Sequence, residues 1–448
     1  MKAIVDIDHK TEVATPSTQM SNLYQIKIAE IWNYLKREDA LFLLICLYLF
    51  FEYVRPQTLY PALDVIPYTQ IILLLTLAIA LKKGILFATK NAVNHLLTAF
   101  FLIIVISSVF AFDPGHAFSM IPNFVAWMII YFLIINIVNT ENRFLIFMLS
   151  FLLYSFKMSQ HSFRGWAGQG FGFSDWGTGG GPGWFHNSGE FGIQMCVFLP
   201  LAACFFWALK EYWPLWKKVL LALLPITAVT GMVSSSSRGA LLGGVAVMLF
   251  FLLKSKYKIK GTIALVLILG AVYLAIPEEQ KMRFQQAGDD QTSMNRIERW
   301  EKGLEMAKRY PLLGVGYRNW EMADNRLFLG SGAYCHNIFI ECMSELGYSG
   351  LAVFILMIGY TFINNHKTIK IAKERLGGNK FISYMAHGLD GALIGYLVSG
   401  FFVTVLYYPY FWINLSMTVA LHGVAKNEAA KRYRVEHESL SDHTSNLD

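Results

Sequence analysis

Long apolar runs are the feature that most constrains the fold of this chain. A helix needs about 20 mainly apolar residues to cross the hydrocarbon of a bilayer, where its backbone finds no hydrogen-bond partner outside the helix. Hydrophobic residues make up 55% of the 448 residues and charged residues only 15%, too few to cover a soluble protein of this size. We therefore predict an all-α polytopic membrane protein with about twelve transmembrane helices. The predicted spans cover residues 40–54, 66–81, 92–112, 119–138, 143–158, 190–209, 217–235, 238–253, 261–277, 345–364, 385–406 and 409–425.

The polar stretches predict the rest of the organisation. No apolar segment with a small-residue cleavage site precedes the first span, so we expect no cleaved signal peptide. Within the longest polar stretch, residues 296–310 place apolar side chains three to four positions apart, which predicts an amphipathic helix that lies on the membrane surface or caps the bundle. The predicted parts are a cytoplasmic N-terminal segment at 1–39, helices 1 to 9 within 40–277, a large periplasmic loop at 278–344, helices 10 to 12 within 345–425, and a cytoplasmic tail at 426–448.

The distribution of basic residues predicts the orientation. A cytoplasmic N-terminus puts 25 of the 38 Lys and Arg residues on the cytoplasmic side, together with the C-terminus, as the positive-inside rule requires. The cations left outside are mostly Arg, whose planar fork of donors suits phosphate or carboxylate better than the Lys ammonium does. Pairing with nearby Glu side chains or with lipid phosphates is the alternative. These outer Arg residues are Arg55, Arg164, Arg238, Arg283, Arg296, Arg299, Arg309, Arg318 and Arg326.

A glycine-rich outer segment covers residues 159–189. Nine Gly residues stand among residues 165–183 and alternate with Trp and Phe. Glycine lets backbone N–H groups turn toward an anion, and aromatic rings stack on sugars or lie among lipid headgroups. The segment therefore predicts either a ligand-binding loop or an aromatic loop at the membrane interface. Its polar candidates are His161, Arg164, His186 and Glu190.

Two further outer positions are candidates for chemistry. His336 opens the helix of AYCHNIFIECMSELGYSG, and the positive end of a helix dipole keeps an imidazole neutral and able to act as a general base. A structural cap is the alternative. Arg238, in VSSSSRGALLGG, stands at the outer boundary of two spans, where an Arg is seldom kept without a partner. Its alternative partner is a lipid phosphate.

Metal and nucleotide chemistry find little support in the sequence. Asp289 and Asp290 form an adjacent acidic pair that could hold a metal, but a solvated loop is the commoner explanation. The chain has no C-x-x-C pair, H-E-x-x-H motif or P-loop. We therefore expect no metal, no other cofactor and no nucleic-acid partner.

The ordered set SSSSRGALLGG, YPLLGVGYRNW and CHNIFIECMSELGYSG resembles the O-antigen ligase and polymerase superfamily of bacterial membrane glycosyltransferases. The stretch YVRPQTLYPALDVIPYTQI is similar to the exosortase-associated O-glycosylation ligase branch. This resemblance implies transfer of a glycan from undecaprenyl pyrophosphate to an acceptor hydroxyl on the periplasmic face of the inner membrane. It also implies that His336 corresponds to the His that the family needs for activity, and Arg238 to the Arg of the family's Ser-Arg-Gly motif. Either Arg296 or Arg299 corresponds to the Arg that the family carries in its large periplasmic loop.

The residue chemistry is compatible with this reaction. Guanidinium groups can hold a pyrophosphate leaving group without a metal, while His336 takes the proton of an attacking hydroxyl and the anomeric carbon inverts. We expect Arg164 and Arg318 to join the donor-binding residues. We expect Asn337, Glu341 and His186 to support the residues of this site.

The acceptor is the main open choice. Our first prediction is that the protein transfers the glycan to the lipid A-core oligosaccharide. We also expect membrane lipids to be partners of the protein. Transfer onto protein and O-antigen polymerisation are alternatives that use the same donor. A transporter of lipid-linked sugar is the alternative from another class, although no internal repeat supports it.

Overall fold

The computed structural model describes residues 23–172, 177–181, 185, 187–275, 278, 281–282 and 291–445, and all regular structure within them is helical. A helix lies within each of the twelve predicted spans, which confirms the all-α polytopic fold, but residues 110–112 and 401–406, predicted to be parts of two spans, are not helical. These helices are α3 (Ala40–Tyr53), α5 (Tyr68–Lys82), α6 (Ala92–Val109), α7 (Pro114–Ile137), α8 (Glu141–Gly168), α9 (Ser188–Leu209), α10 (Leu215–Ser234), α11 (Arg238–Lys254), α12 (Lys258–Ala275), α16 (Ile338–Glu374), α17 (Lys380–Gly400) and α18 (Pro409–Ser445). The others are α2 (Ile28–Arg37), α4 (Pro56–Leu59), η1 (Pro61–Leu63), η2 (Lys210–Tyr212), α14 (Gln291–Arg309) and α15 (Trp320–Phe328).

Eight of the twelve helices are long and apolar enough to cross a membrane by themselves, counted over the described residues. They are α3, α5, α6, α7, α9, α10, α16 and α17. The other four are α8, α11, α12 and α18. Of these, α11 has only 17 residues, while α8 and α18 carry polar and charged side chains along their length. The number of spans therefore lies between eight clear ones and the twelve predicted.

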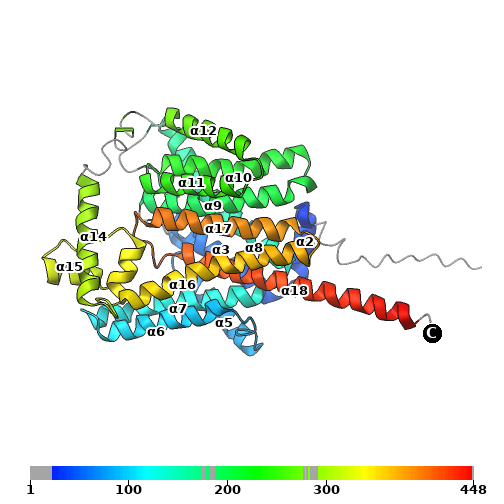
Figure 1. Cartoon of the computed structure of the whole chain (residues 1–448), viewed down its shortest axis with the longest axis horizontal. Coiled ribbons are helices and arrows are strands. Elements are labelled where there is room, and N and C mark those ends of the chain that lie inside the picture. The colour runs from blue at the N-terminus through cyan, green and yellow to red at the C-terminus, as the bar shows by residue number, and fades with distance from the viewer. Residues whose placement is uncertain are drawn as a thin grey trace, which may run out of the picture.

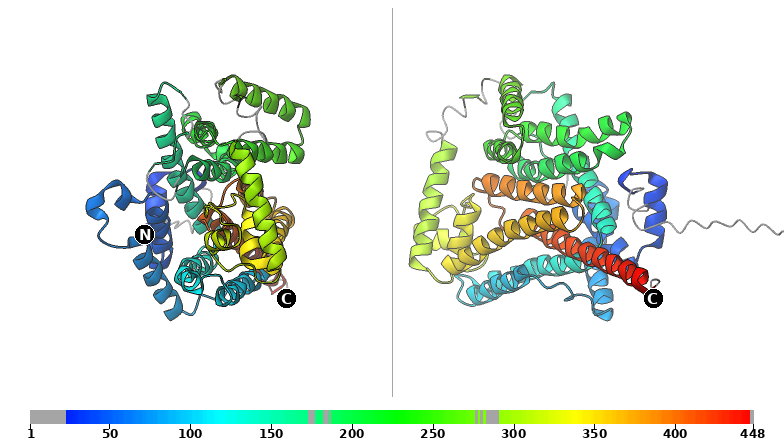
Figure 2. Two further views of the ribbon diagram at one scale, coloured as in Figure 1. Left: turned by 90° about the vertical axis from the view of Figure 1, so that its left-hand side faces the viewer. Right: turned by 45° about the vertical axis from the view of Figure 1, so that its right-hand side comes forward.

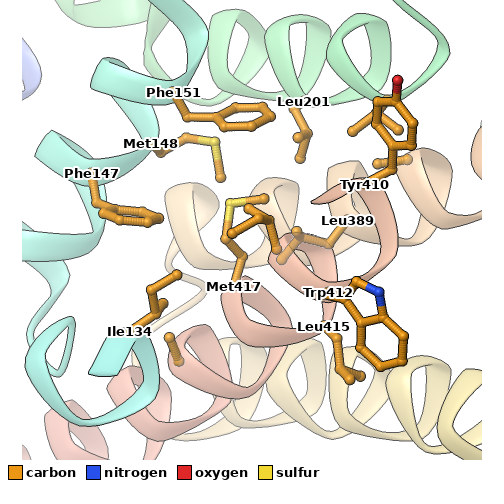
Figure 3. Close-up of a cluster of buried hydrophobic side chains, with 14 of the residues drawn as sticks. Ile134, Phe147, Met148, Phe151, Leu201, Leu389, Tyr410, Trp412, Leu415 and Met417 are labelled. Atoms are coloured by element: carbon orange, nitrogen blue, oxygen red, sulfur yellow. The ribbon is translucent and has the colours of Figure 1, made fainter. Parts of the chain in front are cut away.

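The centre of the bundle is formed by α9, α17 and α18. Of the apolar stretch of α9, 83% is buried, more than in any other candidate span. Helix α17 packs against α9, α11, α16 and α18. Figure 3 shows the core in which α18 contributes Trp412 and Met417, both fully buried, to a cluster with side chains from α7, α8, α9 and α17. The segments that connect these helices are therefore attached to rigid ends.

Different helices lie at the two ends of the bundle. Helices α14 and α15 lie at one end, which we call the loop end, and α2 and the last turns of α18 lie at the other (Figures 1 and 2). At the loop end, the turn between α6 and α7 contacts the long connection: Phe112 N–H donates to the Val315 carbonyl at 3.0 Å. At the other end, Arg143 pairs with Glu38 at 2.7 Å. That the loop end is periplasmic remains a prediction.

A kink in α16 shapes the loop end. Gly347 has φ 70°, outside helical geometry, so residues 338–346 form a first segment at an angle to the rest. The turn 311–316 follows this segment closely: Val315 N–H donates to the Ser344 carbonyl at 2.8 Å. A side chain on Gly314 would lie within 2.5 Å of the Glu345 backbone, so only glycine allows this approach.

The predicted amphipathic helix is α14, and it caps the bundle. Met306 and Ala307 on its apolar side are fully buried. Gly303 lies against Ile340 of α16 and the ring of Trp320, where a side chain would clash with both. Of the two positions expected from the sequence, contact with the bundle is therefore the one observed.

Candidate active site

The segment 401–408, between α17 and α18, brings Arg238 and His336 to the same end of the molecule. The backbone N–H of His336 donates to Thr404 Oγ1 at 3.0 Å, and Nδ1 of its ring lies 3.4 Å from the same oxygen. On the other side, Gly239 at the start of α11 packs against Phe402, where an added side chain would approach to 3.0 Å. The residue that opens α11 and the residue that precedes α16 thus border one short stretch of chain.

The turn that carries Arg238 is closely supported. Ser237 caps α11, since its hydroxyl accepts a hydrogen bond from Ala240 N–H at 3.3 Å. The described part of the glycine-rich segment lies on this turn: Thr178 N–H donates to the Ser234 carbonyl at 2.8 Å. Gly177 has φ 63°, and a side chain there would lie 2.2 Å from the Ser235 carbonyl oxygen. The glycines therefore allow the backbone to pack against the turn that holds Arg238, which is itself half-buried.

His336 is half-buried beside two cations. Its backbone has φ 52°, and the next residue, Asn337, caps α16 by accepting hydrogen bonds from Phe339 and Ile340 N–H. Burial, together with the positive charges of Arg296 and Arg299, lowers the pKa of His336 to about 4. The imidazole is therefore neutral at neutral pH, as expected. Burial is the largest cause of the lowered pKa, ahead of the charges of Arg296 and Arg299.

Helix α14 places Arg296 and Arg299 near His336. Trp300 Nε1 donates to the Cys335 carbonyl at 2.9 Å, and Arg299 Nη1 donates to the Tyr334 carbonyl at 3.4 Å. These two bonds hold α14 along the chain that leads into His336. Both candidates for the loop arginine lie in this helix, and both charges act on the same imidazole.

Arg318 lies in different surroundings. Its guanidinium carbon is 4.6 Å from the centre of the Tyr407 ring. Burial opposes its charge, but Tyr317 and the carboxylates of Glu341 and Glu345 outweigh burial, so the pKa of Arg318 is raised. Neighbouring groups of the protein therefore stabilise the positive charge of Arg318.

Glu345 is the main residue that the sequence analysis missed. It is 1% exposed and accepts hydrogen bonds from Arg318 N–H at 3.1 Å, from Trp320 N–H at 3.4 Å and from the Tyr407 hydroxyl at 3.0 Å. Glu341, one turn earlier, accepts from Leu406 N–H at 3.4 Å. Two Glu residues four positions apart in an apolar helix were the available signal for this buried pair.

Glu190 joins α9 to the same segment. Its carboxylate accepts hydrogen bonds from the Tyr408 hydroxyl at 3.2 Å and from Asn187 Nδ2 at 3.0 Å. Asn187 also caps α9 by accepting from Glu190 N–H at 2.9 Å. Segment 401–408 is therefore held by carboxylates from both α9 and α16.

The remaining candidates lie apart or outside the described residues. Arg164 is exposed near the end of α8, and no described contact joins it to His336. His186, Asp289 and Asp290 lie outside the described residues. In the part of the chain that is described, no group of three or more His, Cys, Asp or Glu residues could hold a metal ion.

The matched family covers the residues just described. The family described as O-antigen ligase matches residues 221–355, from α10 into the first half of α16. This match supports membership of the O-antigen ligase superfamily for the part of the chain that it covers. Arg238, Arg296, Arg299, Arg318 and His336 all fall within the matched range. The resemblance to the exosortase-associated branch remains a prediction.

One curated relative matches a shorter stretch. The exopolysaccharide production protein ExoQ of Rhizobium meliloti (strain 1021) is 33% identical over 92 residues. This stretch is 18% of the present chain and 21% of ExoQ, so the chain matches about a fifth of that protein's length. The comparison supports membership of the superfamily, while activity and substrates remain to be proposed.

We predict that the double substitution Arg296→Gln and Arg299→Gln raises the pKa of His336 while leaving it below the ordinary 6.5, because burial persists. The measurement is the pH dependence of carbethoxylation of His336, followed by mass spectrometry of its peptide. Lys302→Gln on the same helix is the control, since Lys302 pairs with Glu298 and Asp324. An unchanged pKa in the double variant would contradict the placement of α14.

Proposed function

We propose that this protein transfers a glycan from undecaprenyl pyrophosphate to an acceptor hydroxyl on the periplasmic face of the bacterial inner membrane, as a member of the ligase and polymerase type. The observation that carries the proposal is a neutral imidazole, His336, flanked by two cations and bordering the same segment as Arg238. A neutral base beside positive charge suits a reaction that takes up a proton while releasing a polyanion.

Each group has a defined task in the proposed reaction. Arg238, with Arg296 or Arg299, holds the diphosphate through paired N–H donors and stabilises the negative charge that develops as the bond to the anomeric carbon breaks. The acceptor oxygen forms the new bond from the opposite face, so the configuration inverts. With Nδ1 donating to Thr404, Nε2 of His336 accepts the hydroxyl proton, and undecaprenyl pyrophosphate leaves with the electron pair.

We favour the lipid A-core oligosaccharide as the acceptor. Arg164 and Gly180 show the Arg-x15-Gly spacing described for polymerases, but Arg164 is exposed while Gly180 is buried against Phe191. Polymerisation is the second candidate, since the partial relative ExoQ is named for exopolysaccharide production. Transfer onto protein uses the same donor and chemistry.

Turnover with defined components tests the proposal. The purified protein in detergent should join a lipid-linked glycan to lipid A-core without an energy source, and a transporter should yield no product. In cells, loss of a ligase should leave bare core while lipid-linked polymer accumulates. Core that carries a single repeat unit would identify a polymerase instead.

We predict that His336→Ala reduces transfer to below a few per cent of wild type while membrane insertion is retained. We also expect kcat/KM of the wild type to stay flat from pH 8 to about 5 and to fall as the pH drops through about 4, because the base must be neutral. His366→Ala, at an exposed position of α16, is the control. A fall centred near pH 6.5 would exclude the buried imidazole as the base.

We predict that Arg238→Lys lowers kcat/KM for the lipid-linked donor by about 100-fold, because an ammonium cannot replace a bidentate guanidinium at a developing charge. Arg326→Lys, exposed on α15, should change it less than twofold. Steady-state kinetics with varied donor give the comparison. Near-wild-type activity of Arg238→Lys would leave only a diffuse electrostatic role for this residue.

A further inference from the structure

A cavity of about 520 Å³ opens at the loop end, beside the segment 401–408. It lies between the end of α3, the start of α5 and the outer half of α7. Its lining includes Glu52, Arg55, Asn123, Trp127, Arg318 and Tyr407. The volume lies within the range of about 300 to 1,000 Å³ that is typical of small-ligand sites.

The lining has the chemistry of a carbohydrate site. Guanidinium and carboxylate groups are both present, so the cavity does not favour a polyanion such as a diphosphate. Amides and carboxylates hydrogen-bond to sugar hydroxyls, and the aromatic side chain of Trp127 lines the cavity beside them. The buried Oε1 of Gln57, which also lines the cavity, accepts no hydrogen bond within the described residues. A hydroxyl donor would satisfy it.

The wall of the cavity is linked to His336 through segment 401–408. Trp127 Nε1 donates to the Tyr407 carbonyl at 3.2 Å, so the wall of the cavity is bonded to segment 401–408. Three residues earlier in this segment, Thr404 contacts His336. Three residues of extended chain span at most about 11 Å. A short saccharide bound in the cavity could therefore present a hydroxyl to the imidazole.

The position of the cavity distinguishes acceptor from donor. The donor ligands of the proposed reaction, Arg238 and Arg296 or Arg299, stand on α11 and α14, whereas most of the cavity wall comes from α3, α5 and α7. Helix α11 lies on the opposite side of α17 from α5 and α7 (Figures 1 and 2). An inverting transfer needs the attacking hydroxyl and the leaving group on opposite faces of the anomeric carbon. We propose that this cavity binds the sugar of the acceptor, an inference that rests on the proposed glycan transfer.

The test replaces amide hydrogen-bonding groups by an apolar side chain of similar size. Asn123→Leu and Gln57→Leu should each raise the KM for lipid A-core at least tenfold, with kcat within threefold and the KM for the lipid-linked donor unchanged. Asn325→Leu, at an exposed position of α15, is the matched control and should change neither constant. A raised donor KM would assign the cavity to the donor glycan and overturn the proposal, as would unchanged constants in both variants.

A binding measurement separates this inference from the proposed function. Core oligosaccharide freed from lipid A is titrated calorimetrically into the full-length protein without donor. Asn123→Leu should weaken its binding at least tenfold relative to wild type and to Asn325→Leu. Equal binding by all three proteins would overturn the cavity assignment even if transfer occurs. Selective weakening without any transfer by wild type would support the cavity and refute the transferase.

Discussion

The loop end depends on two carboxylates buried in the first segment of α16. Removing a charged carboxylate from water costs several kcal/mol unless hydrogen bonds or opposite charges compensate. Glu345 is compensated by Arg318 N–H, Trp320 N–H and the Tyr407 hydroxyl, and Glu341 by Leu406 N–H. These donors come from two connections far apart in sequence. The need to satisfy two Glu side chains therefore fixes how both connections lie relative to the helix that follows His336.

The Arg residues at the loop end lie in two different environments. Glu341 and Glu345 act on Arg318 and, with Tyr317, raise its pKa, so its charge is stabilised within the protein. Arg296 and Arg299 act on His336, whose pKa they and burial lower. Under the proposed function, a bound diphosphate would offset these two charges and raise the proton affinity of the imidazole. The base would then accept a proton most readily when the donor is in place, and no carboxylate partner would be required.

Features that depend on interactions between residues close in sequence could be predicted, whereas features that depend on contacts between distant segments could not. The twelve helices follow from the local demand that a backbone in lipid satisfies its own hydrogen bonds, so apolar runs were enough to find them. The neutral state of His336 was also expected, and burial is the largest cause of its lowered pKa. Segment 401–408 was not expected to matter, because most of it, residues 401–406, was predicted to lie inside a transmembrane span. Its contacts with Glu190, Glu345 and His336 join four helices, and spacing along the chain does not reveal which helices meet.

The family match covers the residues around His336 but little of the cavity wall. The general base and its neighbouring Arg residues lie within residues 221–355, whereas most of the cavity wall comes from residues 48–127 and from Tyr407. Arg318 is the cavity residue that belongs to the matched range. If the transfer is as proposed, the part shared with the family would handle the lipid diphosphate, and helices outside the match would choose the acceptor. Because the carboxylates of α16 hold both parts in register, the acceptor side could change in composition without disturbing the position of His336.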